Sequence, residues 1–578
     1  MSVRWCAAVG AAGVLFGCAH GRETAAAATR PEARTLAAAL LGREATAAES
    51  TSPAALWQAV ERQDELLADW LRQDVGLAHG SELFEAADGA SRFLKTAIAR
   101  TVSETARAPV SDRQNLASAL AAYRQACAAR RAQRLARVRA EMPRLVYARH
   151  FVMGGSHYAY TEALSDAQAE RNFHAGGKLC LAEWREGLWQ ETVLAETKEG
   201  VIRDADVNYD GTKILYALKQ SDRGDDYHLY EMDAATRAVR QLTEGLGAAD
   251  YEGCYLPNGD IVFNSTRCMQ IVDCWWTEVS NLYRCDRDGR NILRLTFDQV
   301  HLNYPTVAPD GDIYYTRWEY NDRSQMYPQP LFQMAPDGTQ QRAVYGENSW
   351  FPTTIIHARG IPGSRKIFAI ATGHHSRQPG DLILIDPAKG RQEADGVTLV
   401  APVRPTQSVI VDAYGQDGDL FAYPYPIDER SLIVMYSPDG WEHRDGRRHE
   451  NRLTGFGIYW MDIDGRRELL VSRQGLACGR PVPLRPRPRP AARPSAIDLA
   501  KRDGTFYVQD VYVGEAMAGV PRGTVKTLRV IGLDYRIAGI GSNGNSGPGG
   551  GAMISTPPSV GNGAWDPKIL VGDAPVHE

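Results

Sequence analysis

The sequence predicts a mainly β protein: a six-bladed β-propeller preceded by an α-helical region, with seven blades as the alternative. Two observations lead to this prediction. A short strand pattern recurs about every 50 residues, and before most copies a tight-turn dipeptide leads into a second apolar run. Two hairpins per repeat make four strands, which is one propeller blade. The chain has 578 residues with 44% hydrophobic content, which suffices for such a core.

The first 18 residues predict an export signal. Arg4 precedes an apolar stretch, and Cys18 follows Leu15-Phe16-Gly17 as in a bacterial lipoprotein cleavage site. We expect a signal over residues 1–18, lipidation at Cys18, and a periplasmic or outer-membrane lipoprotein of a bacterium; a plain signal peptide or anchor is the alternative. The lipid is the only membrane contact expected, because no later stretch is apolar for about 18 residues.

The next two segments are a tether and a helical region. Residues 19–52 are Ala-rich without apolar periodicity and predict a flexible tether, and residues 53–142 predict helices. In the latter, Ser111 and Gln114 form a capping box, and Pro143 ends the helical pattern. The arginines near its end are interpreted as a solvated helix face, with binding of an acidic partner as the alternative: Arg130, Arg131, Arg134, Arg137 and Arg139.

The propeller is expected over residues 143–478. The recurrent strand begins at Leu179, Leu229, Leu282, Leu331, Leu382 and Ile458, and six copies predict six blades. The strand before it follows a turn such as Asp210-Gly211, because Asp-Gly supplies the positive φ that a tight hairpin requires. These preceding strands are expected at 214–218, 261–265, 313–316, 366–372 and 432–437. An insertion before the last copy holds Trp441, His443 and His449.

Proline and glycine dominate the remainder of the chain. The run from Cys478 to Pro494 holds too many prolines for a central strand, so residues 479–500 predict an extended Pro-rich strap. Residues 501–578 predict strands at 505–511 and 527–533 and a flexible Gly-rich loop at 541–551.

Propeller connectivity predicts which polar residues meet. The segment that enters each first strand and the loop that leaves each second strand lie on one face, opposite the Asp-Gly turns. Carboxylates, imidazoles, thiols and arginines should converge there, a composition typical of a metal or redox site. The candidates are Asp204, Asp206, Cys268, Cys274, His301, Arg317, Glu319, His374 and His375, none of them assigned a catalytic role.

Structural roles are the alternative for these residues. Asp206 would tie neighbouring strands, and Cys268 with Cys274 would form a disulfide, the default for two nearby thiols in an oxidising compartment. The competing interpretation is a zinc ion held by one thiolate with His301, Asp206 or His374. The 65 basic and 70 acidic residues give a net charge of −5, which argues against a nucleic-acid binder.

Several stretches resemble the family related to the hydrazine synthase alpha subunit. They are Arg203-Asp-Ala-Asp-Val-Asn-Tyr-Asp-Gly, Cys254-Tyr-Leu-Pro-Asn-Gly-Asp, Tyr315-Thr-Arg-Trp-Glu-Tyr, Gly373-His-His, Pro483-Leu-Arg-Pro-Arg-Pro-Arg-Pro and Gly519-Val-Pro-Arg-Gly-Thr-Val-Lys. The resemblance implies an exported protein with a six-bladed middle propeller and a C-terminal cytochrome-like domain. That domain carries Cys-x-x-Cys-His, which this sequence lacks, so c-type haem is expected only on a domain beyond this chain.

Two functions follow from these observations. The leading expectation is a cell-envelope propeller that belongs to a haem-dependent redox system and supplies the pocket rather than the haem. Hydrazine synthase activity itself is not carried over, because it needs haems and partner subunits. The alternative is a non-catalytic binding or scaffolding propeller, similar to Tol-associated periplasmic proteins. An unidentified protein partner in the envelope is compatible with either function, and neither the partner nor a substrate is indicated by the sequence.

Overall fold

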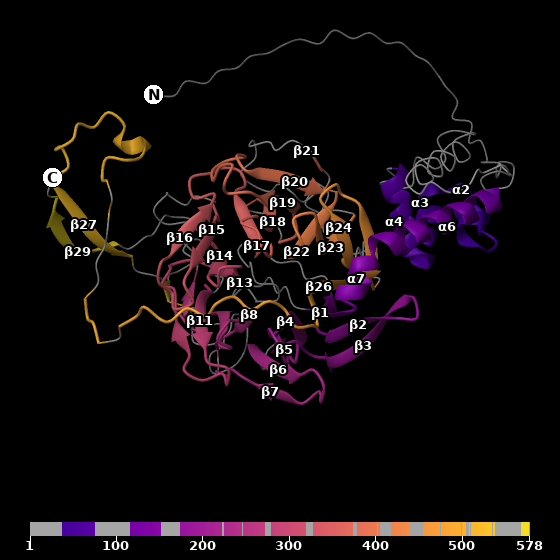
Figure 1. Ribbon diagram of the computed structural model, residues 1–578, viewed down its shortest axis with the longest axis horizontal. Coiled ribbons are helices and arrows are strands. Elements are labelled where there is room, and N and C mark those ends of the chain that lie inside the picture. The colour runs from indigo at the N-terminus through magenta and orange to yellow at the C-terminus, as the bar shows by residue number, and fades with distance from the viewer. Residues whose placement is uncertain are drawn as a thin grey trace, which may run out of the picture. The chain divides into compact units, whose positions relative to one another are not determined.

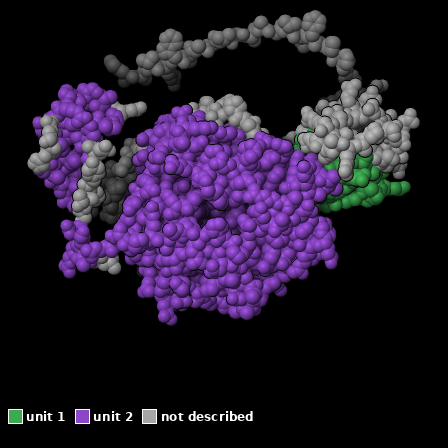
Figure 2. All heavy atoms as spheres, viewed as in Figure 1, with its two compact units in different colours: residues 1–126 green, residues 127–578 purple. Residues whose placement is uncertain are grey.

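The computed structural model describes residues 37–75, 116–151, 174–221, 225–245, 247–271, 279–319, 328–373, 378–401, 403–404, 418–438, 455–473, 475–498, 500–503, 508, 510–533, 536–537 and 568–576. The chain divides into two compact units, residues 1–126 and 127–578 (Figure 2). None of the described helices is long and apolar enough to cross a membrane. Several predictions concern residues outside the described ranges: the signal with Cys18, the Ser111–Gln114 capping box, the insertion with Trp441, His443 and His449, and the Gly-rich loop.

The first unit is helical. Thr46 caps the helix α2 (Ala47–Thr51) in a capping box with Glu49, and Ser52 caps the next helix, α3 (Pro53–Gln63), which begins at a proline. The prediction of a flexible tether over residues 19–52 is wrong for its last part, because residues 37–41 are also helical and bury Leu40 and Leu41. The helices are α2, α3, α4 (Glu65–Val75) and the beginning of α6 (Leu116–Arg134).

The second unit contains six antiparallel blades arranged in a ring, so the predicted six-bladed propeller is confirmed (Figure 1). From the channel outwards the blades are β26-β1-β2-β3, β4-β5-β6-β7, β8-β9-β11-β12, β13-β14-β15-β16, β17-β18-β19-β20 and β22-β23-β24-β25, the fifth with an extra strand β21. The predicted recurrent strands are the third strands of the blades, and the runs after the turns are the second strands.

The bounds of the first three blades are β26 (Leu476–Pro483), β1 (Arg144–Phe151), β2 (Gly177–Arg185), β3 (Leu188–Thr197), β4 (Val201–Val207), β5 (Lys213–Lys219), β6 (Tyr227–Asp233), β7 (Val239–Gln241), β8 (Asp250–Tyr255), β9 (Ile261–Ser265), β11 (Asn281–Cys285) and β12 (Leu293–Arg294). Those of the last three are β13 (Leu302–Val307), β14 (Ile313–Arg317), β15 (Leu331–Met334), β16 (Arg342–Tyr345), β17 (Thr354–Gly360), β18 (Ile367–Thr372), β19 (Asp381–Ile385), β20 (Val397–Ala401), β21 (Val403–Arg404), β22 (Leu420–Pro426), β23 (Ser431–Ser437), β24 (Gly457–Asp462) and β25 (Arg467–Val471).

The first blade closes the ring with a strand from the other end of the propeller. β26 pairs with β1, with Leu145 opposite Pro483 and Arg149 opposite Cys478. The expected strap over residues 479–500 is therefore wrong for residues 479–483, which belong to β26. An innermost strand has a hydrogen-bonded neighbour on one side only, so a proline fits where its nitrogen faces the channel. The N–H of Leu484 donates to Arg144, which leaves the nitrogen of Pro483 on the channel side.

Residues 485–498, called the strap below, form no regular structure and lie along turns on one side of the propeller, both between first and second strands and between third and fourth strands. We call this side of the propeller the turn face. Arg489 pairs with Asp210 at 2.9 Å, Arg493 pairs with Asp312, and the N–H of Ala496 donates to Asp337 at 2.6 Å. The strap is therefore fastened to turns of two blades, the second and the fourth.

The arginines of α6 and α7 (Ala136–Glu141) pack on the propeller. Arg131 and Arg134 pair with the buried carboxylate of Glu468 at 3.5 and 3.0 Å. The guanidinium of Arg139 lies 5.0 Å from the ring centre of Trp184. The prediction of a solvated arginine face is wrong here, because these side chains attach the helices to two blades.

The C-terminal part forms small two-stranded sheets. The predicted strand at 527–533 is confirmed, whereas the described residues within 505–511 form no strand. The elements are β27 (Thr527–Leu533) paired with β29 (Lys568–Pro575), β10 (Gln270–Ile271) paired with β28 (Arg536–Ile537), and a short 3₁₀ turn, η2 (Glu515–Met517).

Candidate functional site

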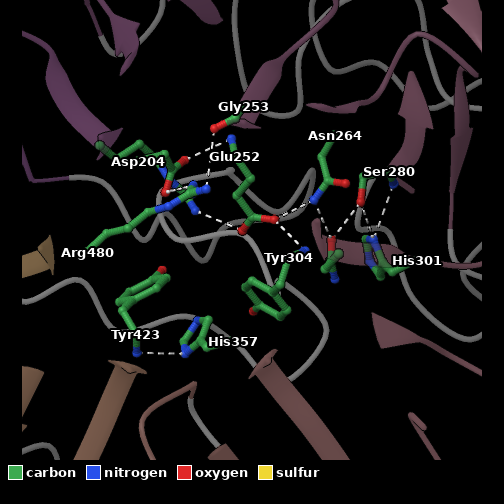
Figure 3. Close-up of polar contacts among 12 residues, drawn as sticks. Asp204, Glu252, Gly253, Asn264, Ser280, His301, Tyr304, His357, Tyr423 and Arg480 are labelled. Carbon is green, nitrogen blue, oxygen red and sulfur yellow. Dashed lines mark hydrogen bonds and ion pairs between the residues drawn. The ribbon is translucent and has the colours of Figure 1, made fainter. Parts of the chain in front are cut away.

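Each innermost strand carries one residue with a left-handed backbone, at the place where the pairing with the second strand slips by a bulge. The bulges turn these six side chains toward a common space in the channel (Figure 3). We call this set the channel ring: Asp204 (φ 61°), Glu252 (φ 54°), Tyr304 (φ 59°), His357 (φ 52°), Tyr423 (φ 48°) and Arg480 (φ 50°).

One side of the ring is a buried cluster of opposite charges. Arg203, the neighbour of Asp204, contacts the Asp204 carboxylate at 2.6 Å and Glu252 at 3.2 Å. Arg480 lies 3.6 Å from Asp204 and donates to the carbonyl of Gly253 at 3.3 Å. Two guanidinium groups thus face two carboxyl groups, and all four side chains are buried. Removing one partner would leave an uncompensated buried charge, which is strongly destabilising.

Glu252 connects this cluster to a chain of polar side chains. It accepts hydrogen bonds from the N–H of Tyr304 at 2.7 Å and from the amide of Asn264. Burial and the adjacent charge of Asp204 raise the pKa of Glu252 to about 8. From Asn264 the chain of contacts runs to Asn303, then to Ser280, and ends at His301.

The other side of the ring is aromatic. The ring of His357 stacks on Tyr423, with centres 3.7 Å apart, and meets Tyr304 edge-on at 4.5 Å. The N–H of Tyr423 donates to Nδ1 of His357 at 3.4 Å, which assigns the imidazole proton to Nε2. Burial and the charges of Arg480 and Arg203 hold the pKa of His357 well below its usual range. Among the described residues Nε2 has no acceptor, so its N–H is available for a further hydrogen bond.

Asp204 belongs to the ring, and the polar chain described above connects it to His301. Nδ1 of His301 accepts from the N–H of Ser280 at 3.2 Å, and its ring stacks parallel to Trp318. Asp206 accepts from the N–H of Tyr255 on β8 at 3.1 Å. It therefore ties two blades together, as the structural alternative predicts.

Of the other predicted residues, the structure describes Arg317, Glu319 and Cys268. Arg317 pairs with Asp298 at 2.9 Å and with Glu319 at 3.0 Å. The thiol of Cys268 lies 3.2 Å from the carbonyl of Val279. Cys274, His374 and His375 lie outside the described residues, so the Cys268–Cys274 disulfide stays a prediction.

The described residues do not fit a zinc site. No three histidine, cysteine, aspartate or glutamate side chains come close enough to share a metal ion in the described part of the chain. The zinc interpretation therefore depends on Cys274 and His374. Covalent haem does not fit this sequence either, because it holds no Cys-x-x-Cys-His.

Most of the channel ring was not among the predicted candidates. Glu252, Tyr304, His357, Tyr423 and Arg480 come from five strands, and no one residue type is common to the set. One signal was available for part of the set. Asp204, Glu252 and Tyr304 each precede the Asp or Asn of the following tight turn by six residues. Aligning the repeats on these turns would have placed those residues at one height in the channel.

The strand order defines this protein as a six-bladed β-propeller. Neither the sequence model of a known family nor the sequence of a curated protein matches the chain. Among solved structures it is similar in fold to hydrazine synthase from Kuenenia stuttgartiensis, with a TM-score of 0.47 and 16% identity over 61% of this chain and 48% of that one. The match thus spans about half of that chain.

Two further propellers are similar in fold. TolB from Acinetobacter baumannii has a TM-score of 0.35 and 15% identity, over 65% of this chain and 73% of that one. The propeller domain of the Trilobed protease from Pyrococcus furiosus has a TM-score of 0.31 and 14% identity, over 51% of this chain and 76% of that one. At these identities the similarity is one of fold alone.

Proposed function

We propose that this protein is an exported propeller of the cell envelope whose channel ring binds a small polar ligand, and that it supplies this site to a haem-dependent redox system. The signal ending at Cys18 supports the location. The motifs that resemble the hydrazine synthase alpha family support the redox connection. The haem would belong to a partner or to a further domain, because this sequence has no attachment motif.

The residue types of the channel ring carry the proposal. At a positive φ glycine is unstrained, whereas other L-residues cost roughly 1 kcal/mol each. If the bulges served only the architecture, glycine or asparagine would suffice at these places. None of the six blades uses either residue there; the ring holds two acids, two tyrosines, a histidine and an arginine. The strained backbone at these six positions is therefore tolerated because the side chains themselves are needed there.

The ring offers two kinds of group to a ligand. The neutral imidazole of His357 presents its Nε2–H as a donor. Glu252, with a pKa of about 8, is protonated at neutral pH and can release a proton when a bound ligand is reduced. The carboxylate left behind would face Arg203. Groups whose pKa values are pushed apart in one cavity are typical of acid–base sites.

Ligand-induced stabilisation tests the site. We would measure the free energy of unfolding with nitrite, hydroxylamine, ammonium and sulfite, using the wild type, His357→Asn and Glu252→Gln. A ligand at about 100 times its Kd stabilises the folded state by about 2.7 kcal/mol. Asparagine tolerates the left-handed backbone of His357, so that variant should fold. Gln340→Gly is the matched control, because Gln340 has a φ of 57° at a turn outside the channel.

We expect at least one compound to stabilise the wild type and Gln340→Gly but neither ring variant. If no compound stabilises the wild type, or if the effect survives in both ring variants, the channel ring is not the site.

The scaffolding alternative has its own supporting observation. Asp206, His301 and Arg317 all have partners within the propeller, which is what structural residues require. Cross-linking in the native envelope followed by haem staining separates the two functions. A haem-stained adduct favours the redox system, and adducts without haem favour scaffolding. A Cys-x-x-Cys-His encoded downstream of codon 578 would also favour the redox system.

A further inference from the structure

A second group of charged side chains lies in the channel on the side of the turn face. Arg359 follows His357 by two residues on β17, just as Asp206 follows Asp204 on β4. Arg487 reaches the same place from the strap. Arg359 approaches one oxygen of Asp206 at 3.7 Å, and Arg487 approaches the other at 3.5 Å. We call Asp206, Arg359 and Arg487 the lower cluster.

The lower cluster is incompletely hydrogen-bonded. The guanidinium of Arg359 makes no hydrogen bond with any described residue; it lies 4.5 Å from the ring centre of Tyr425, and the side chain is 16% exposed. Oδ1 of Asp206 is buried and, within the described residues, has no hydrogen-bond donor. Buried groups of this kind are normally satisfied. The cluster therefore has both donors and an acceptor available.

The channel also holds more positive than negative charge. Four guanidinium groups, those of Arg203, Arg359, Arg480 and Arg487, face the carboxylates of Asp204 and Asp206 and the carboxyl group of Glu252, so at least one positive charge is unbalanced. Burial and the charges of Arg487 and Arg480 lower the pKa of Arg359 from its ordinary value. An unbalanced buried cation is costly, and an anion bound beside it would remove that cost.

The strap holds Arg487 in place for such a ligand. Its N–H donates to the carbonyl of Tyr209 at 2.9 Å, and Nη2 donates to the carbonyl of Val207, also at 2.9 Å. The guanidinium lies 4.4 Å from the ring centre of Tyr209. A guanidinium fixed in this way loses little entropy on binding an oxyanion.

From this geometry we propose that the lower cluster binds a small oxyanion that carries its own proton, of the type of hydrogen phosphate. Its oxygens accept from Arg359 and Arg487, and its O–H donates to Oδ1 of Asp206. Sulfate has no proton near neutral pH, so one of its oxygens would face the Asp206 carboxylate. The site thus selects phosphate over sulfate. This inference does not depend on the function proposed for the channel ring.

Titration calorimetry of the full chain near pH 7, at constant ionic strength, tests the proposal with inorganic phosphate, sulfate and methyl phosphate. We expect phosphate to bind at least tenfold more tightly than sulfate. Arg359→Met should weaken phosphate binding at least tenfold. Arg489→Met is the matched control, because this strap arginine pairs with the exposed Asp210 and should leave binding unchanged. Methyl phosphate shows whether free phosphate or a phosphate monoester is preferred.

Asp206→Asn gives the sharpest test. The asparagine oxygen can still accept from the N–H of Tyr255, while its amide places a donor where Oδ1 was. Sulfate should then bind at least as tightly as phosphate. The proposal would be overturned if the wild type bound phosphate and sulfate with equal affinity, or if it bound no phosphate at 10 mM (roughly the −2.7 kcal/mol level). It would also be overturned if a folded Asp206→Asn kept the preference for phosphate over sulfate. If that variant does not fold, the comparison of Arg359→Met with Arg489→Met decides.

Discussion

Replacing His228 by glutamine should remove a defined pH dependence from the stability of this protein. His228, on β6, lies between two carboxylates: Nε2 is 3.5 Å from Asp225, and Nδ1 is 3.6 Å from Asp250 on the next blade. Burial lowers the pKa of His228, but the two carboxylates outweigh it and raise the pKa to about 9. Arg267 also contacts Asp250, at 2.6 Å, and keeps that carboxylate charged.

The size and sign of the effect follow from this shift. A histidine pKa raised from 6.5 to about 9 corresponds to about 3 kcal/mol, because each tenfold change in proton affinity is worth about 1.4 kcal/mol. The pKa is higher in the folded state than in the unfolded state. The stabilisation is therefore fully present below pH 6.5 and disappears as the pH rises through 9.

Urea unfolding from pH 6 to 10 checks this prediction on wild type and His228→Gln. The raised pKa of Glu252, about 8, also lowers the free energy of unfolding as the pH rises from 4.5 to 8. This decrease is the same in both proteins. The informative quantity is therefore the difference between the two unfolding free energies. We expect it to shrink by about 3 kcal/mol between pH 6.5 and 9. A difference that stays constant over this window would refute the reasoning.

Three further predictions concern other parts of the chain. Gly211→Ala places a Cβ 2.5 Å from the backbone of Arg485 at a φ of 71°, so it should loosen the strap and speed hydrogen exchange of the Arg487 N–H, which donates to Tyr209, at least tenfold; unchanged exchange would contradict this. Cys18→Ser should abolish labelling by radioactive fatty acid and release the protein from membranes, whereas persistent labelling would exclude lipidation at that residue. For Cys268 and Cys274, thiol counting on denatured, unreduced protein should find neither thiol free and a mass two hydrogens below the reduced chain; two free thiols with stoichiometric zinc would support the metal site.

The blades could be predicted because their signals are local. Each tight turn, such as Asp210-Gly211, stands a few residues from the strand that it starts, and the repeat supplies six copies of the pattern. The strand β26 could not be found in this way. It lies far from its partner β1 in sequence, and the strap follows it instead of a tight turn.

The candidate site was predicted only in part for a related reason. Connectivity placed Asp204 on a first strand and His301 at the entry to another, but the network between them depends on the bulges that bring Glu252 and Tyr304 together. A bulge leaves no residue-type signature in these strands, because the left-handed residues are not glycines. Arg487 reaches the channel from outside the blades, and no repeat pattern could indicate that contact.

The pairing of β26 with β1 also determines when the propeller can be completed during synthesis. Leu145 and Pro483 are partners separated by 338 positions, so the first blade lacks its innermost strand until almost the whole propeller has left the ribosome. Closing a loop of this length costs roughly 5 kcal/mol in chain entropy, which the nearly complete ring must supply. Until then β1 presents an open edge that can pair with other chains. A chaperone that covers this edge would protect the growing chain from aggregation.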